Sequence, residues 1–479
     1  MKILFAVGEC LPYIKTGGLA DVIGAVPKIL AKKGHDVRVV MPGYSKINRE
    51  KFGFKSAMKG FTVNHKGVDI FENVMESDYT PGVKTYIICQ DDFFAREKIY
   101  GEADDAQRFI FFQKSVMALM DKLEFYPNIV HCHDWHTALL PVYIKEAVRF
   151  GKWQLGETKS VFTIHNLGYQ GRFGAEVCQD AGLGYDLFTG DKLEYYGLFN
   201  FMKGGLVYAD KITTVSPTYA REILEPQNGW GLDGVLRSRE KDLSGIINGL
   251  DYNDWGPEND LNIPVRYSVY KRAGKAKCKE VLQKTSGLTV DPNIPVFTLV
   301  SRLAEQKGFN VLVPAMRDLL AHTDAQFIFQ GTGEKAYEQM AYDMSRDFKQ
   351  QVRYIDKYSE AMARMIYAGG DLFVMPSKYE PCGLGQMIAL TYGNVPLVAY
   401  TGGLCDTVFD YDLDEKGNGF LFSPVTEFNC QENLWRAYNK YKFQKPQWEK
   451  IVTNAFKSKF TWDDSVSKYE AVYRSAIEG

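Results

Sequence analysis

The chain has 479 residues, of which 45% are hydrophobic and 24% are charged, and its formal net charge is −2. That length exceeds one ordinary hydrophobic core and predicts two domains. The balanced charge gives no basic excess for nucleic acid, and no run reaches the roughly 18 apolar residues of a membrane span. The eight cysteines form no Cys-x-x-Cys pair, which favours reduced thiols. We therefore expect a cytoplasmic protein that binds neither nucleic acid nor a membrane.

Short apolar runs alternate with helical patterns in the first half of the chain. The predicted strands are Lys2–Val7, Asp36–Met41, Lys84–Cys89, Ile129–Cys132, Ser160–Ile164 and Lys211–Val215. Helices are predicted at Asp21–Lys33 and Asp105–Lys122, and Gln227–Asp242 is typical of a loop or a short helix. This alternation predicts a parallel sheet built from strand–helix–strand units.

A second series of elements follows in the other half. Its predicted strands are Gly245–Asn248, Val296–Val300, Gln326–Gln330, Val352–Ile355, Leu372–Met375 and Pro396–Ala399. Its predicted helices are Gly308–Ala321, Lys335–Lys349, Ser359–Ala368, Gly385–Thr391 and Ser465–Ile477. The fold class is therefore α/β, with two doubly wound domains that join near residue 245.

Open parallel sheets bind ligands beyond the carboxyl ends of their strands, and a repeated phrase lies at two such places. Gly-Gly-Leu-x-Asp occurs at Gly17–Asp21 and again at Gly402–Asp406. A glycine pair at a strand-to-helix turn exposes backbone N–H groups and a helix dipole to an anion. With Lys15 beside it, the first copy suits a diphosphate, but a tight turn with a solvated lysine is an equal interpretation. Asp21 either binds ligand or, more simply, caps the helix.

Histidines and an aspartate follow two further strands of the first half. His131, His133 and His136 invite a metal interpretation, but no second cluster completes a metal's ligand set. Polar contacts from Asp134 to a sugar are the better hypothesis. His165 ends the strand Ser160–Ile164, on the same expected rim as Lys15 and Asp134, which favours a functional role over a structural one.

The second half places charged and aromatic residues in equivalent positions. Arg302 and Lys307 follow the strand Val296–Val300. Cations at a helix start are electrostatically poor, so we interpret them as partners of a bound diphosphate. Tyr354 and Tyr358 are each compatible with stacking on a nucleobase or with packing. Glu380 lies at the next strand end, and nothing around Cys382 indicates a thiol nucleophile.

Together these segments resemble the bacterial glycogen synthase and plant starch synthase family. The strings that carry the resemblance are Lys15-Thr16-Gly17-Gly18-Leu19-Ala20-Asp21-Val22, His133-Asp134-Trp135-His136, His165-Asn166, Asn248-Gly249-Leu250-Asp251, Ser301-Arg302-Leu303 with Lys307-Gly308, Glu380-Pro381-Cys382-Gly383-Leu384, and Thr401-Gly402-Gly403-Leu404. They occur in the family's order over nearly the whole chain. Cys405 departs from the usual alanine. Ile388 stands where a related transferase family has a second glutamate, which favours the synthase branch.

The resemblance implies a GT-B glycosyltransferase, in which two Rossmann-like domains face a deep cleft. Residues 1–244 would form the acceptor-side domain, joined by a C-terminal helix in 458–479, and residues 245–457 the nucleotide-sugar domain. The implied reaction transfers glucose from ADP-glucose to the non-reducing end of an α-1,4-glucan, with retention at the anomeric carbon. The glucan would be glycogen, starch or a malto-oligosaccharide, and neither a metal nor another cofactor is expected.

The same resemblance implies roles for individual residues. The expected catalytic residues are His165, Glu380, Arg302 and Lys307. The expected substrate-binding residues are Lys15, Gly18, Asp134, Asn248, Tyr358, Cys382, Gly383, Leu384 and Gly403. Retention normally requires two carboxyl groups, and no such pair is evident. The family-consistent hypothesis is attack from the face that the diphosphate leaves, with His165 positioning the sugar and its backbone carbonyl stabilising the oxocarbenium-like state.

Several alternatives remain compatible with the sequence. UDP-glucose is an alternative donor, because the sequence does not distinguish adenine from uridine. A nucleotide-sugar epimerase of the same fold would turn over donor without a glucan. An inactive glucan-binding protein would release no nucleotide diphosphate, and a phosphorylase would need a cofactor lysine that cannot be identified here.

Overall fold

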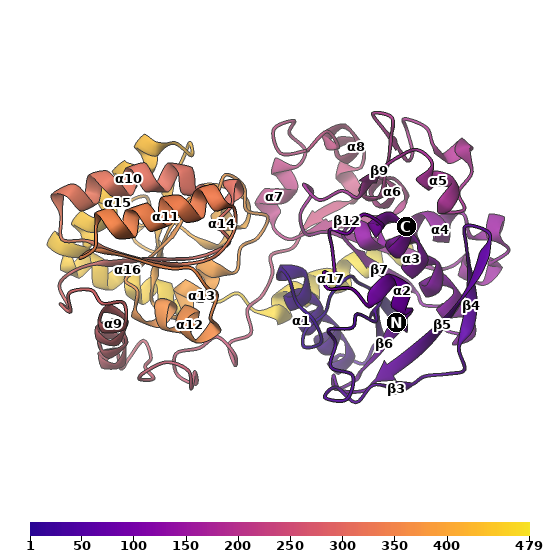
Figure 1. Cartoon of the computed structure of the whole chain (residues 1–479), viewed down its shortest axis with the longest axis horizontal. Coiled ribbons are helices and arrows are strands. Elements are labelled where there is room, and N and C mark those ends of the chain that lie inside the picture. Colours follow the sequence, from indigo (N-terminus) through magenta and orange to yellow (C-terminus); the bar gives the residue numbers. More distant parts are fainter. The chain divides into compact units, whose positions relative to one another are not determined.

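The computed structural model describes the backbone of residues 1–479 and all side chains except those of Val148, Phe150 and Trp153. The chain divides into two compact units; Figure 1 draws the first in indigo to magenta except for its yellow C-terminal helix, and the second in pink through orange to yellow. The first unit comprises Met1–Gly249 and Trp462–Gly479, and the second comprises Leu250–Thr461. Within the described part of the chain, none of the helices combines the length and apolarity that a bilayer span requires.

A ten-stranded sheet forms the core of the first unit. Its strand order is β13-β12-β8-β7-β1-β2-β6-β5-β3, with β4 paired to β5. The parallel strands are β1 (Lys2–Ala6), β2 (Asp36–Pro42), β6 (Val83–Cys89), β7 (Ile129–His133), β8 (Lys159–Ile164), β12 (Lys211–Thr214) and β13 (Leu243–Gly245). Because these strands run in one direction, their carboxyl ends meet at one edge of the sheet.

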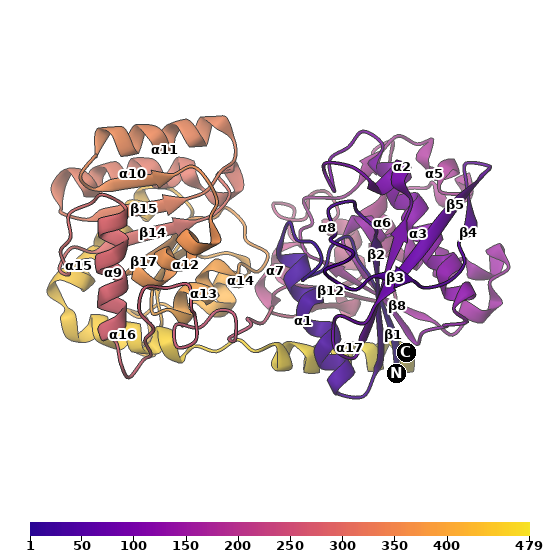
Figure 2. The ribbon, with the colours of Figure 1, turned by 60° about the horizontal axis from the view of Figure 1, so that its bottom comes forward.

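Helices cover both faces of this sheet. On one face lie α1 (Gly18–Lys32) and α17 (Trp462–Glu478), which contact each other and stand side by side in Figure 2. On the other lie α3 (Asp105–Lys122), α4 (Leu140–Lys145) and α6 (Phe201–Tyr208). Alternate strand residues serve the two faces: His131 bonds Tyr473 of α17 at 2.7 Å, whereas the ring of Phe162 packs against Gly205 of α6. The final segment of the chain therefore belongs to the first core.

An antiparallel extension on the first unit was not predicted. Strands β3 (Lys55–Ser56), β4 (Phe61–His65) and β5 (Val68–Ser77) continue the sheet past β6. A separate small sheet joins β9 (Arg172–Phe173), β10 (Glu194–Tyr195) and β11 (Leu198–Asn200). The two- and three-residue strands β3, β9, β10 and β11 carry almost no periodicity, which is why the sequence gives little sign of them. Strands β4 and β5 are longer, with five and ten residues, and were missed although β4 alternates between buried and exposed residues.

The second unit contains a six-stranded, wholly parallel sheet in the order β16-β15-β14-β17-β18-β19. Its strands are β14 (Val296–Val300), β15 (Gln326–Gln330), β16 (Val352–Ile355), β17 (Leu372–Met375), β18 (Val395–Ala399) and β19 (Phe420–Phe422). Its helices are α9 (Ala273–Thr285), α10 (Phe309–His322), α11 (Lys335–Asp347), α12 (Glu360–Gly369), α13 (Gly385–Thr391), α14 (Gly402–Thr407), α15 (Glu427–Phe443) and α16 (Lys445–Lys457). Figure 1 shows α10 and α11 on one face of the sheet and α12, α13 and α16 on the other.

One strand prediction was wrong. The sequence assigned Gly245–Asn248 to the start of the second sheet, but the observed strand, β13, ends at Gly245 and pairs in parallel with β12 of the first sheet. The pairing continues beyond it, because Ile246 N–H donates to Thr214 C=O at 2.8 Å. The second sheet instead begins with β14. The boundary between the units therefore follows Gly249 rather than residue 244.

The ambiguous segment Gln227–Asp242 contains a short helix, α8 (Asp233–Ser238), preceded by a glycine-rich turn. The unpredicted helix α7 (Pro217–Glu222) follows β12, and its N-cap residue Ser216 accepts from Tyr219 N–H. Strand β13 packs closely against the start of this helix. A Cβ atom on Gly245 would lie 2.4 Å from the carbonyl oxygen of Ser216, so glycine lets the last strand approach the helix start.

Candidate functional site

The carboxyl ends of four parallel strands gather the expected residues of the first unit on one edge. The loop after β1 carries Lys15, Asp134 follows β7, His165 follows β8, and Asn248 lies three residues after β13. The corrected position of β13 is what brings Asn248 to this edge. We call this set of loops the first rim.

Sequence reasoning missed a carboxylate, Glu9, in the glycine-rich turn of the first rim. Glu9 is 3% exposed and accepts hydrogen bonds from the hydroxyl of Thr16 at 2.6 Å, the N–H of Thr16, and the N–H of Gly17 at 3.2 Å. Burial raises the pKa of Glu9, and the bonds from Thr16 and Gly17 oppose that effect. The N–H groups of Thr16 and Gly17, just before α1, are therefore already bound to a carboxyl group of the protein itself. The sequence did contain a sign of this role, because Glu9 follows β1 at the strand end where ligand-binding residues are expected.

Lys15 and Asp21 form an ion pair across the same turn. Lys15 Nζ lies 2.7 Å from Asp21 Oδ1, and the lysine side chain is 44% exposed. The prediction that Asp21 caps the helix was wrong, because the N-cap is Gly17 and Asp21 lies in the first helical turn. An acid in that turn still suits the helix dipole. The pair holds the cation at the rim, where it is accessible to solvent.

Gly18, the first residue of α1, has an unusually open environment. A Cβ atom built on it would meet no atom within 4 Å, and its φ is not in the left-handed region. Packing within the unit therefore gives no reason for a glycine here. A ligand that approaches the backbone closely is a sufficient reason.

Asp134 is held in a strained position beneath the loop after β8. Its φ of +55° is uncommon for a residue with a side chain. Its Oδ1 atom accepts the N–H groups of His165 at 2.8 Å and of Asn166 at 3.4 Å. Burial raises the pKa of Asp134 to about 7. The carboxylate thus orients the His165 turn, and Oδ2 is left for a ligand hydroxyl.

The histidines of the first rim form a neutral network. His165 Nε2 lies 3.0 Å from His133 Nδ1, and His131 bonds Thr163 at 2.6 Å as well as Tyr473. Burial lowers the pKa of His165 to about 3 and those of His131 and His133 well below the usual value. Within the part of the chain whose side chains are described, no three His, Cys, Asp or Glu residues gather around a possible metal position. His165 therefore acts as an uncharged hydrogen-bonding group.

Asn248 is buried and incompletely satisfied. It is 4% exposed, and among the described residues its Oδ1 atom has no hydrogen-bond partner. A buried amide oxygen without a partner costs free energy, and a hydroxyl of a bound sugar would satisfy it. The unpaired amide oxygen of Asn248 is therefore compatible with the substrate-binding role expected for this residue.

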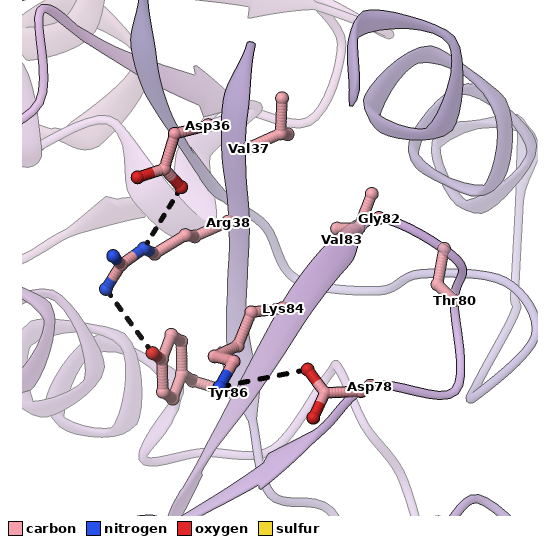
Figure 3. Close-up of a pocket in the computed structure, with 9 residues that line it drawn as sticks. All are labelled: Asp36, Val37, Arg38, Asp78, Thr80, Gly82, Val83, Lys84 and Tyr86. Atoms are coloured by element: carbon pink, nitrogen blue, oxygen red, sulfur yellow. Dashed lines mark hydrogen bonds and ion pairs between the residues drawn. The ribbon is translucent and has the colours of Figure 1, made fainter. Parts of the chain in front are cut away.

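A pocket elsewhere in the first unit is not the candidate site. It is lined by the first residues of β2 and β6 (Figure 3), at the edge of the sheet opposite the first rim. Its cations already have partners: Arg38 lies 3.4 Å from Asp36 and Lys84 lies 3.8 Å from Asp78. The charges are balanced in place, so this pocket has no special attraction for an anionic ligand.

In the second unit, glycines join the loops that follow neighbouring strands. A Cβ atom on any of five glycines would lie within about 2.2 Å of a carbonyl oxygen in the adjacent loop, a distance that real Cβ atoms do not reach. The glycine and oxygen pairs are Gly331 with Ser301, Gly333 with Leu303, Gly308 with Pro376, Gly402 with Glu380, and Gly403 with Cys382. Together these contacts link the loops after β15, β14, β17 and β18 into one structure, which we call the second rim.

The two expected cations of the second rim have different environments. Lys307 Nζ pairs with Glu380 Oε2 at 2.5 Å, and the hydroxyl of Ser377 donates to the same oxygen at 3.1 Å. Arg302 is exposed, and no described residue accepts a hydrogen bond or forms an ion pair with its guanidinium. The rim therefore presents one fixed cation–carboxylate pair and one guanidinium that is not neutralised.

The remaining expected residues divide into exposed and packed groups. Tyr358 is 63% exposed, whereas Tyr354 is 8% exposed and donates to the Gly331 carbonyl at 2.9 Å, so Tyr354 is the packed tyrosine. Gly383 has a φ of +75°, and Leu384 is the N-cap of α13. Cys382 is buried, and its carbonyl accepts from Gln386 at 3.1 Å.

The N–H of Gly403 is already engaged within the protein. It donates to the Glu380 carbonyl at 3.0 Å, and the substrate-binding role expected for Gly403 stays a prediction. The two Gly-Gly-Leu phrases are therefore not equivalent. The first leaves Gly18 open, whereas the second is a packing contact that positions the Glu380 loop.

Comparisons with known proteins agree with this geometry. A family model described as the starch synthase catalytic domain matches residues 2–238, and one described as glycosyl transferases group 1 matches residues 284–450. The glycogen synthases of Geotalea daltonii and Thermotoga maritima are each 42% identical to the chain, and the alignments cover 100% of it and 99% of each relative. The chain belongs to the glycogen and starch synthase family. It is a glucosyltransferase with glycogen or starch synthase activity.

Solved structures show the same fold in members of this family and beyond it. The catalytic domain of starch synthase IV from Arabidopsis thaliana, bound to ADP and acarbose, matches with a TM-score of 0.92 and 31% identity, covering 100% of this chain and 99% of that one. Sucrose-phosphate synthase from Thermosynechococcus elongatus matches with a TM-score of 0.59 at 16% identity over the same shares of the two chains, which supports the fold alone. The synthase thus has the two-domain GT-B fold.

Gly18→Ala and Gly403→Ala separate the roles of the two glycine phrases. We expect Gly18→Ala to leave the melting temperature unchanged or slightly higher, because alanine favours a helix by roughly 0.5–1 kcal/mol, and to lower activity by blocking a ligand. Gly403→Ala should lower stability by about 1–3 kcal/mol, since its Cβ would lie 2.2 Å from a carbonyl oxygen. Thermal unfolding and initial rates test both. Full activity in Gly18→Ala would show that no ligand approaches this glycine.

The pKa of Asp134 predicts an acid limb in the pH profile. Below its pKa of about 7 the carboxylate gains a proton, so its free oxygen becomes an O–H donor and a much weaker acceptor for a sugar hydroxyl. If the reaction needs the charged acceptor, kcat/KM should fall about tenfold per pH unit. The isosteric Asp134→Asn should show a low, flat profile. It should also be more stable than the wild type above pH 7, where the wild type buries a charge. Persistence of the acid limb in Asp134→Asn would assign it to another group.

Proposed function

We propose that this synthase transfers glucose from ADP-glucose to the non-reducing end of an α-1,4-glucan, with retention at the anomeric carbon. Adenine as the base is supported by the related Arabidopsis starch synthase IV, whose solved structure is bound to ADP and acarbose. The glucan acceptor is supported by the glycogen synthases that align with the whole chain.

The environment of Arg302 is the observation that carries the proposal. A guanidinium at the carboxyl end of β14, exposed and without an ion pair in the described structure, is ready to bind an anionic leaving group. Lys307 adds a second charge that Glu380 holds in place. Cations fixed before the reaction stabilise charge that develops on a departing diphosphate. On the first rim, Lys15 and the open backbone of Gly18 stay predicted contacts of a phosphate group.

The sugar and the base are assigned to residues whose surroundings suit them. Tyr358, an exposed ring after β16, is proposed to stack on the adenine. On the first rim, Asp134, His165 and Asn248 are proposed to bind glucose hydroxyls. On the second rim, the loop of Cys382, Gly383 and Leu384 is proposed to border the sugar beside Glu380.

The proposed retaining mechanism uses no carboxylate nucleophile. On the first rim, Glu9 and Asp134 both accept backbone N–H groups within their own loops, and on the second Glu380 is paired with Lys307. We therefore favour attack by the acceptor hydroxyl from the face that the diphosphate leaves, with its proton passing to the leaving phosphate. No described residue donates to the His165 carbonyl oxygen, which is thus available to stabilise positive charge on the sugar.

Other expectations remain predictions. Neither a metal nor a further cofactor is part of the proposed reaction, because Arg302 and Lys307 supply the positive charge. The assignment of donor binding to the second unit and acceptor binding to the first, and the cytoplasmic location, also stay predictions.

Competition between ADP-glucose and UDP-glucose tests the donor. With glycogen as acceptor, we expect glucose transfer from ADP-glucose to exceed transfer from UDP-glucose at least tenfold in kcat/KM, measured with radiolabelled donors in one mixture. Analysis of the newly formed linkage by an enzyme specific for α-1,4 bonds tests retention. Preferential use of UDP-glucose would replace the donor but leave the synthase reaction intact.

Arg302→Ala tests the role of the unpaired guanidinium. We expect kcat to fall by about 10²–10³ with a modest change in donor KM, because the charge is needed most when the leaving group departs. Arg302→Lys should recover part of the rate. Lys378→Ala, which removes a cation paired with Glu305 in the same loops, is the matched control and should retain activity. A large rise in donor KM with normal kcat would make Arg302 a binding residue only.

A further inference from the structure

Trp230 adopts a backbone conformation that tryptophan rarely adopts. Its φ is +51°, within the left-handed region, and it is followed by Gly231 with a φ of +77°. For a bulky side chain this conformation is costly, and such residues concentrate at functional sites. Despite that cost, the tryptophan is not used to fill the core, because it is 45% exposed.

A set of buried polar groups maintains this conformation. The Trp230 carbonyl accepts the hydroxyl of Tyr195 at 2.7 Å and the amide of Gln170 at 3.1 Å. Gln170 is 5% exposed and is itself fixed by the fully buried Asn200, whose Nδ2 donates to Gln170 Oε1 at 2.8 Å. Asn200 in turn caps α6, because its Oδ1 accepts from Lys203 N–H at 3.0 Å. Hydrogen bonds from Gln170, Tyr195 and Asn200, which lie in separate segments of the first unit, thus fix the Trp230 backbone directly or through one another, while the indole stays exposed.

The indole lies against the loop that carries His165. A Cβ atom on Gly168 would lie 3.5 Å from the Cε2 and Cζ2 atoms of Trp230, and 3.1 Å from Asn166 Oδ1. Asn166 Oδ1 accepts the Gly168 N–H at 2.9 Å. Its Nδ2 atom has no acceptor among the described residues. The Trp230 indole and the Asn166 amide therefore both lie beside Gly168, in the loop that follows His165.

We propose that Trp230 and Asn166 form a sugar-binding subsite for the acceptor chain, in which a glucose unit stacks on the indole and one of its hydroxyls accepts from Asn166 Nδ2. A glucose ring has an apolar face of C–H groups and a rim of hydroxyls, and an aromatic ring with a neighbouring polar donor matches both. This inference rests on the glucan acceptor of the proposed function and adds the residue that determines its affinity. Two further exposed aromatic residues belong to the same segments: Tyr169 follows Gly168, and the ring of Tyr196 lies 4.8 Å from that of Tyr195.

Trp230→Gly is the decisive variant, because glycine adopts the observed φ without strain. It should unfold at the same or a higher temperature than the wild type. We expect KM for maltoheptaose to rise about 3- to 10-fold, while KM for ADP-glucose and the slow hydrolysis of ADP-glucose without glucan stay unchanged. Trp230→Phe keeps a ring and should recover most of the acceptor affinity.

A binding measurement makes the result independent of turnover. Calorimetric titration of maltoheptaose into the full chain should show weaker binding for Trp230→Gly by the same factor. Tyr185→Ala removes another exposed aromatic residue of the first unit, 54% exposed, and should change neither KM nor binding. If the wild type transfers glucose but Trp230→Gly has unchanged acceptor KM and binding, the subsite is wrong and the proposed function stands. If the wild-type protein itself transferred no glucose to maltoheptaose, that result would instead refute the proposed function. If Trp230→Gly and Trp230→Phe each lost acceptor affinity and donor affinity equally, Trp230 would be structural, and the inference would also be overturned.

Discussion

Close contact between backbones at the carboxyl ends of parallel strands is the constraint on which the second unit's site depends. Three loops of the second rim, those after β15, β14 and β18, pack a glycine against a carbonyl oxygen of the loop beside them, where any side chain would overlap that oxygen. These contacts run across β15, β14, β17 and β18 in the order in which the strands neighbour one another. Arg302, Lys307 and Glu380 are thus fixed by backbone packing. The packing fixes the backbone positions of these residues, and the ion pair fixes the Lys307 and Glu380 side chains as well, which is what electrostatic preorganisation requires.

The first rim solves a different physical problem. Apart from the exposed Lys15, its expected polar site residues are buried or half-buried, so its histidines are neutral and the pKa of Asp134 is raised to about 7. Such groups bind hydroxyls through hydrogen bonds and avoid strong charges, which suits a sugar. The second rim keeps a charged pair and an unpaired guanidinium, which suits a phosphate. The sugar contacts proposed for Asp134 and His165, and the diphosphate contacts proposed for Arg302 and Lys307, therefore suit the different burial and charge of these side chains.

Much of the fold was accessible from the sequence. The strands that carry the expected site residues are long apolar runs, and the structure places β1, β7, β8, β14 and β17 within a residue or two of their predicted bounds. Gly245–Asn248 was misassigned because hydrophobic periodicity identifies a strand without naming its partner. The short strands β9, β10 and β11 were missed because two or three residues carry no period. Yet this small sheet supplies Tyr195 and Asn200, which support Trp230.

By itself, the sequence determined the chemistry available: cations, an acid, histidines and glycines just beyond strand ends, in an order that indicated a glucan synthase. Only the tertiary structure decided which of these groups are already engaged. It gave the Gly17 N–H to Glu9 and the Gly403 N–H to Glu380, left Gly18 open, and kept the guanidinium of Arg302 without a partner in the described structure. The reason is physical. Residue type and spacing specify what a group can bind, but its availability depends on neighbours that are distant in the chain and meet only when both sheets have formed.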